Sequence, residues 1–112
     1  MDLLSLFVFL SVGVILVIVG MIFHAAPPSN INGLYGYRTP RSMRDQASWD
    51  LAQAHSAKLM IYAGIAASGI GLAAWYTDPD LLFGCVVMIF QLLTVVPVIL
   101  STESKLKKIQ RR

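Results

Sequence analysis

Three long apolar runs without a charged residue leave this chain few possible folds. They cover residues 3–23, 59–76 and 81–100. At ~1.5 Å per residue, each run forms a helix about as long as the ~30 Å hydrocarbon core of a bilayer is thick. Charged residues make up 13% of the chain, whereas soluble domains carry about 25%. We predict an all-α integral membrane protein, one domain over residues 1–112, with transmembrane helices over 3–23, 59–76 and 81–101.

The nine Lys and Arg residues lie on one side of this predicted topology. Four stand between the first two runs and five follow the third, while the start of the chain and the turn at 77–80 have none. The positive-inside rule then predicts an N-terminus outside the cell and a basic tail, residues 102–112, in the cytoplasm. The first run lacks the basic start of a signal peptide, so we expect it to remain as a helix.

The net charge of +3 does not indicate nucleic-acid binding. The basic residues flank the ends of membrane helices, where such residues meet anionic lipid headgroups. No nucleic-acid-binding motif accompanies them. The lipid bilayer is therefore the partner that the charge pattern predicts.

A polar segment, residues 32–58, separates the first two runs. Two prolines before it end the first helix. Ser42 and Asp45 have the spacing of a capping box, which predicts a short amphipathic helix between the first and second spans, within residues 24–57 and along the inner membrane interface. Trp49 lies midway along it and suits the headgroup level.

The second and third runs carry signals for helix packing. Ala63, Ala67 and Gly71 recur at four-residue spacing and predict a small-residue face for close helix contact. Pro97 predicts a kinked or loosened helix near the end of the third run. The single cysteine, Cys85, lies within that run, and we expect it to be a small buried apolar side chain.

No catalytic motif is present. The chain has no serine nucleophile motif, no H-E-x-x-H and no glycine-rich phosphate loop. His24 and His55 are far apart and show no ligand spacing with an Asp. We therefore predict a protein that is not an enzyme and has no catalytic, cofactor or metal site, and we expect His55 to be a hydrogen-bonding group at the interface.

Arg38 and Gln91 each leave two interpretations open. Arg38, in a glycine-containing loop, either clamps a carboxylate or phosphate or pairs with Asp45 or Asp50, because its planar fork suits both roles. Gln91, at the centre of the third run, either hydrogen-bonds Ser68 or a backbone carbonyl, or lies on a translocation pathway. A pathway needs more polar residues than these runs contain, which argues against a transporter acting as a monomer.

The polar segment resembles the signature of the SdpI family of bacterial membrane proteins, in order and in spacing. The pattern is an Asn, then G-x-R-T, then Ser-Met, Trp, A-H and Lys, and it is carried here by Asn32, Gly36, Arg38, Thr39, Ser42, Trp49, His55 and Lys58. The chain departs from the pattern at Ala57, where the family usually has Gly. The resemblance covers the core module, and we expect the chain to correspond to that module without the extra N-terminal membrane helices of longer members. The resemblance implies an inner-membrane protein without catalytic activity.

In its best-known member, the family protects the producing cell from a secreted peptide toxin and holds a transcriptional repressor at the membrane when toxin is present. We therefore expect immunity to, or signalling of, an antimicrobial peptide toxin through residues 32–58, with a peptide toxin and a cytoplasmic regulator as candidate partners. The alternative is a small structural or accessory subunit of a larger membrane complex, or a homo-oligomer. Short loops, a small-residue face and a basic tail suit that alternative.

Overall fold

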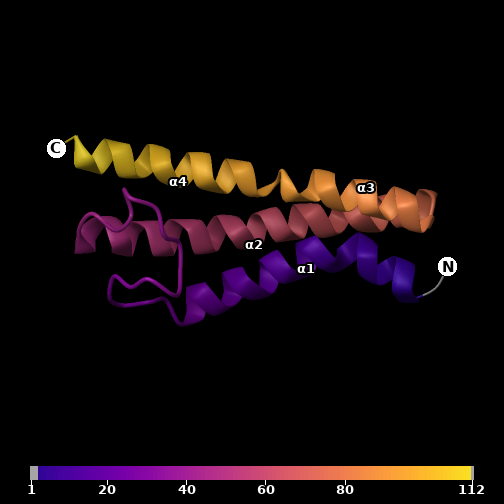
Figure 1. Cartoon of the computed structure of the whole chain (residues 1–112), viewed down its shortest axis with the longest axis horizontal. Coiled ribbons are helices and arrows are strands. Elements are labelled where there is room, and N and C mark those ends of the chain that lie inside the picture. The colour runs from indigo at the N-terminus through magenta and orange to yellow at the C-terminus, as the bar shows by residue number, and fades with distance from the viewer. Residues whose placement is uncertain (1–2, 112) are drawn as a thin grey trace.

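The computed structural model describes residues 3–111, and that part of the chain folds into four helices and no strand (Figure 1). The last two helices follow one another almost in line, so the molecule is a bundle of three rods with a longest dimension of 52 Å. Three stretches, Leu3–Ala25, Gln46–Thr77 and Leu81–Gln110, are long and apolar enough to cross a membrane. The predicted all-α fold with three spans is confirmed. The helices are α1 (Leu3–Ala25), α2 (Gln46–Thr77), α3 (Leu81–Leu92) and α4 (Val95–Gln110).

The amphipathic helix expected before the second span is the first part of α2, which runs on into that span without a break. Its expected start at Ser42 is wrong, because Asp45 is the capping residue. The Asp45 carboxylate accepts a hydrogen bond from the Ser48 N–H at 2.8 Å, and this bond lowers the pKa of Asp45. Ser42 lies buried in the preceding turn. The basic tail likewise is the end of α4 rather than a separate segment, and Arg112 falls outside the described residues.

α1 and α2 pack most closely where their small residues meet. Gly64, Ala67 and Gly71 of α2 are buried against α1, and Gly13 is buried on the α1 side. A Cβ atom added to Gly71 would lie 2.0 Å from the Phe9 carbonyl oxygen, so glycine is required at this crossing. The predicted small-residue face is confirmed at Ala67 and Gly71. Lipid tails are as apolar as the side chains, so no hydrophobic driving force brings membrane helices together. Close van der Waals contact between backbones stabilises the helix pair instead.

Gln91 joins all three spans. Its side chain is 1% exposed, and its Nε2 donates to Phe9 O of α1 at 3.0 Å and to Ala67 O of α2 at 2.7 Å. The predicted bond to a neighbouring backbone carbonyl is therefore confirmed, in a place where an unpaired amide is costly. The Oε1 atom has no hydrogen-bond partner in the part of the chain that the structure describes.

The third span is interrupted at Leu93 and Thr94. Pro97 has no N–H to donate to Leu93 O, and its ring disfavours the helical approach of that carbonyl. The chain tightens there instead, with Leu93 N–H donating to Phe90 O and Thr94 N–H to Gln91 O, both at 3.0 Å. The loosening predicted near Pro97 is confirmed. Before the break α3 packs against α1; after it, within residues 3–111, α4 packs against α2 but not against α1.

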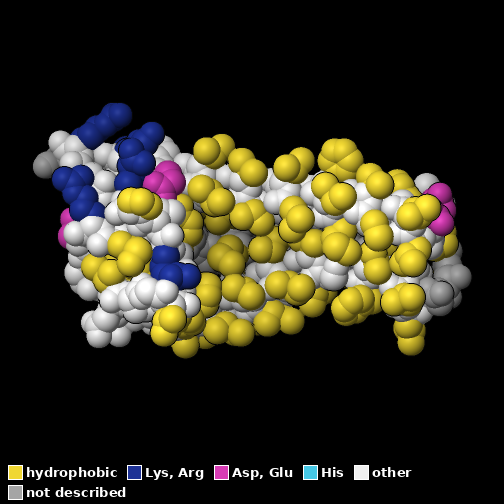
Figure 2. All heavy atoms as spheres, in the orientation of Figure 1, with side chains coloured by type: hydrophobic (Ala, Val, Ile, Leu, Met, Phe, Trp, Pro, Cys, Tyr) yellow, Lys and Arg dark blue, Asp and Glu magenta, His cyan; other side chains and the backbone are white. Residues whose placement is uncertain are grey.

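The outer surface of the bundle is apolar. Figure 2 shows hydrophobic side chains along most of the visible face, with Lys and Arg gathered at the end that carries the loop between α1 and α2. Cys85 belongs to this outward surface, so its predicted burial is wrong: Gly84 and Val87 take the inward positions of α3. An apolar exterior of this kind suits contact with lipid tails.

Candidate functional site

The polar loop, residues 26–45, packs over the end of the bundle formed by the first half of α2 and the second half of α4. Trp49 of α2 is completely buried beneath this loop, with an exposed fraction of 0%. Its Nε1–H donates to the Pro28 carbonyl at 2.8 Å. The expected position of Trp49 at the headgroup level stays a prediction, but its side chain faces the loop and not the surroundings. Trp49 instead holds the chain where it turns away from α1.

Gln53 fixes the G-Y-R-T stretch, residues 36–39, to α2. Its Oε1 accepts from the Tyr37 N–H and its Nε2 donates to the Tyr37 carbonyl, both at 2.7 Å. The side chain is buried, so both bonds are shielded from water. Gly36 has a φ of +104°, and a Cβ there would lie 2.6 Å from Gln53 Oε1. The signature glycine is therefore required by conformation and by space.

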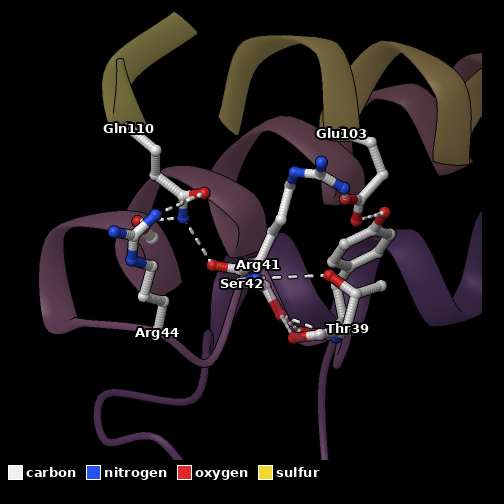
Figure 3. A network of polar contacts seen from close by, with 8 residues as sticks. Thr39, Arg41, Ser42, Arg44, Glu103 and Gln110 are labelled. Atoms are coloured by element: carbon white, nitrogen blue, oxygen red, sulfur yellow. Dashed lines mark hydrogen bonds and ion pairs between the residues drawn. The ribbon is translucent and has the colours of Figure 1, made fainter. Parts of the chain in front are cut away.

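The same stretch is tied to α4 (Figure 3). The Tyr37 hydroxyl donates to Glu103 Oε1 at 2.8 Å, and burial followed by the neighbouring Glu103 raises the pKa of Tyr37. The other carboxylate oxygen of Glu103 pairs with Arg41 at 3.5 Å. Gln110 adds a second clamp, because its Nε2 donates to Arg41 O at 2.8 Å and to Ser48 Oγ at 3.0 Å. Tyr37 and Arg41 of the loop are thereby both fixed to α4.

Several signature residues shape the loop from within. Asn32 Oδ1 accepts from the N–H groups of Leu34 and Tyr35 at 2.9 and 2.8 Å, which forms a side-chain turn. Thr39 and Ser42 bond each other's backbone: Thr39 N–H donates to Ser42 Oγ at 2.8 Å, and Ser42 N–H donates to Thr39 Oγ1 at 3.2 Å. The side chains of Asn32, Thr39 and Ser42 therefore fix the backbone conformation of the loop.

His55 lies between helices and not in a ligand set. Its Nε2 is 2.9 Å from Ser101 Oγ of α4, so the expected hydrogen-bonding role is confirmed. Lys58, one turn further on, is exposed. Among residues 3–111, no three His, Cys, Asp or Glu side chains come together as ligands for a metal ion.

Arg38 differs from its neighbours because it points away from the network. It is exposed, and its Nη1 donates to the Gly33 carbonyl. The expected pairing with Asp45 or Asp50 is wrong: Asp45 caps α2, and Asp50 accepts from Gln46 Nε2 at 2.8 Å. In the described part of the chain, Arg38 has no carboxylate partner. Its guanidinium therefore keeps donors for an anion.

Beside Arg38 lies a cavity of about 330 Å³ that we call the signature groove. It forms where α4 no longer packs against α1. One end is closed by the G-Y-R-T stretch, and the rest is apolar. The apolar lining comes from α1, α2 and α4 and consists of Leu16, Phe23, Met60, Val95, Val98 and Ile99.

A second cavity, of about 580 Å³, opens on the other side of the loop. We call it the basic hollow. Arg41 and Arg44 of the loop face Lys107 and Arg111 at the end of α4, with Pro40 and Gln110 between them. Figure 3 shows the Arg44 guanidinium beside Gln110, whereas the Arg41 guanidinium turns toward Glu103. Within residues 3–111, no acidic residue lines the hollow, although Arg41 also pairs with Glu103 beside it, so the hollow favours an anionic partner.

The two cavities are lined by adjacent residues of the loop. Residues 36–39 line the signature groove, and the next two residues, Pro40 and Arg41, line the basic hollow.

Sequence reasoning missed four residues that build this site: Tyr37, Gln53, Glu103 and Gln110. Signals existed for Tyr37, which lies within the signature stretch next to Arg38, and for Glu103, which is the one acidic residue among the five basic residues after the third run. The two glutamines stand in ordinary helical positions, and their partners are set by tertiary contact.

Comparison with known proteins agrees with the resemblance in the polar segment. The model of the SdpI/YfhL protein family matches residues 29–102. The uncharacterized protein YfhL of Bacillus subtilis (strain 168) is 37% identical over 99 residues, which cover 85% of this chain and 82% of YfhL. No solved structure matches the chain. The family match includes the polar loop from residue 29 on, α2 and α3 and ends within α4, so it contains the loop residues of both cavities.

Proposed function

This chain belongs to the SdpI/YfhL protein family, and we propose that it gives immunity to an antimicrobial peptide toxin or signals its presence. In this proposal it is a protein of the bacterial cytoplasmic membrane that is not an enzyme. Residues 32–58 form its working surface on the cytoplasmic side. Its partners are a membrane-active peptide in the signature groove and an acidic segment of a cytoplasmic regulator in the basic hollow.

The observation that supports this proposal most is that consecutive residues of the loop line the two cavities. A toxin that arrives from outside has few polar groups to meet on the short turn between α2 and α3. A toxin dissolved in the bilayer can instead reach the groove sideways, between α1 and α4. The apolar walls suit its hydrophobic side chains, and Arg38 suits a carboxylate or backbone carbonyl. A charge-assisted hydrogen bond of that kind contributes about 1.5–3 kcal/mol.

The basic hollow supplies the signalling half of the proposal. Four cationic side chains attract an acidic segment and speed its encounter with the protein. Arg41 lines the hollow and also pairs with Glu103, whose other oxygen binds Tyr37 beside the groove. A ligand that moves the G-Y-R-T stretch therefore acts on the position of Arg41.

The proposed orientation makes one prediction. In a Cys85→Ser background, we expect Ser104→Cys to react with a membrane-impermeant maleimide only after the cells are permeabilised, because the positive-inside rule places the end of α4 in the cytoplasm. Asp78→Cys, in the turn at the opposite end of the bundle, is the matched control and is expected to react in intact cells. Both positions are exposed. The reverse labelling pattern would show that the signature faces outward.

The proposed immunity is tested by expressing the chain in a toxin-sensitive strain. We expect the wild type to raise survival against the toxin of the best-known SdpI-family member or another peptide of a membrane-active panel. Arg38→Ala is expected to lower that protection about tenfold, since one charge-assisted bond is lost. Lys108→Ala is the control, because it removes an exposed cation that lines neither the groove nor the hollow. The immunity proposal fails if the wild type protects against none of the peptides.

A further inference from the structure

The signature groove has the composition of a lipid site: an apolar slot with an arginine at one end. We propose that it holds one acyl chain of an anionic phospholipid, with the lipid phosphate on Arg38. This inference shares the groove with the proposed function but concerns its occupant when no toxin is present. It therefore stands or falls separately from immunity.

The depth of the groove in the membrane supports a lipid. Phe23 lies two residues before the end of α1 and Ile99 lies two residues before the polar Ser101, so these lining residues are within ~3 Å of the ends of their apolar stretches. The G-Y-R-T stretch beyond them is then at the level of the headgroup layer, which is about 5–8 Å thick on each side. An acyl chain beside Val95 would then lie in the hydrocarbon core, and a phosphate beside Arg38 would lie in the headgroup layer. These are the depths that the two groups have in a bilayer.

The charge at this end of the groove specifies the headgroup. The acidic residue beside this end of the groove is Glu103, and its two carboxylate oxygens bind Tyr37 and Arg41. Arg38 has no carboxylate partner within residues 3–111. The polar loop carries three arginines and no acidic residue before Asp45. This positive surface repels the ammonium group of a zwitterionic lipid and favours a net negative headgroup. The guanidinium fork also binds phosphate through two parallel hydrogen bonds.

The walls and size of the groove favour a single chain. Its volume of about 330 Å³ is near the lower limit of the ~300–1,000 Å³ found for small-molecule sites. Six apolar side chains from three helices line it. These side chains provide an apolar surface for an acyl chain at the place where α4 does not pack against α1.

The test uses the full chain in a mild detergent with lipid binding measured by native mass spectrometry. We expect phosphatidylglycerol to bind about tenfold more tightly than phosphatidylcholine, and glycerol phosphate in solution not to compete. Arg38→Ala is expected to remove the preference for phosphatidylglycerol, Arg38→Lys to keep part of it, and Lys108→Ala, which changes an exposed cation outside both cavities, to keep all of it. Val95→Trp, which fills the groove, is expected to reduce the binding of both lipids.

Three results would overturn the lipid inference: equal binding of the two lipids by the wild type, an unchanged preference in Arg38→Ala, or displacement by glycerol phosphate, which would indicate a site for free anions. If Arg38→Ala does not fold, the Arg38→Lys and Val95→Trp variants still decide the question. No toxin is present in this measurement. A failed protection assay with intact lipid selectivity therefore contradicts immunity alone, and the opposite combination contradicts the lipid site alone.

Discussion

Gly71→Ala is expected to destabilise the bundle by about 2–3 kcal/mol or more, the upper range for an overpacked core. The added methyl carbon would lie 2.0 Å from Phe9 O and 2.6 Å from Gln91 Nε2. The first of these atoms belongs to the backbone of α1, so it cannot turn aside as a side chain does. α1 and α2 must separate, and the Gln91 bond to Phe9 O lengthens with them. Reversible unfolding in mixed detergent micelles, followed by tryptophan fluorescence, measures the loss.

Gly69→Ala is the matched control for this substitution. Gly69 lies on the same helix, two residues earlier, and a Cβ there meets no atom within 4 Å. We expect this variant to be neutral or to gain up to about 1 kcal/mol from the better helix propensity of alanine. Equal losses for the two variants would mean that helix propensity decides the stability, and the close crossing of α1 and α2 would then have no special weight.

The three spans and their contacts could be predicted from the sequence because each follows from a local rule. Uncharged length predicts a span, small residues at four-residue spacing predict a close crossing, and Pro97 cannot continue a helix. Gln91 was predictable for a similar reason. An amide in the middle of a bilayer must find a carbonyl on a neighbouring helix, whichever helix that is.

The polar loop was harder to predict because its partners are distant in the sequence. Glu103, which binds Tyr37, is 66 residues away from it. Two expectations, that Ser42 caps the helix and that Arg38 pairs with Asp45 or Asp50, failed in part because the Asp45 carboxylate itself caps α2. The Asp45 carboxylate accepts the Ser48 N–H in the first turn of α2, so Ser42 does not cap that helix and Arg38 has no partner in Asp45. A charged carboxylate is a stronger acceptor than a hydroxyl, which explains the outcome.

The structure also divides the family signature by role. Asn32, Gly36, Ser42 and Trp49 hold the loop in shape through backbone bonds, packing or a required conformation. Arg38 is different, because it stands at a cavity with donors directed away from the network. Four signature positions thus hold the loop in shape, and Arg38 is the one of these five that lines a cavity with donors left over. Variants at the four positions test folding, and variants at Arg38 test the proposed function.

Trp49→Ala is expected to cost about 3–5 kcal/mol, as large-to-small changes at buried aromatic residues do. The indole is completely buried, and its N–H bond to Pro28 O is lost as well. Because Trp49 lies under the polar loop and not at the crossing of the spans, the loop should loosen first. We therefore expect faster tryptic cleavage at Arg41 and Arg44 in micelles, while circular dichroism still reports an intact helical bundle.

Trp49→Phe separates the two contributions of this side chain. It keeps most of the ring and loses only the hydrogen bond to Pro28 O, so we expect a cost of about 1 kcal/mol and cleavage close to that of the wild type. Rapid cleavage of both variants would assign the stabilisation to the hydrogen bond and not to packing. Unchanged cleavage in Trp49→Ala would mean that Gln53, Glu103 and Gln110 hold the loop without the indole. The tryptophan would then serve the bundle, and the loop's shape would depend on its polar clamps alone.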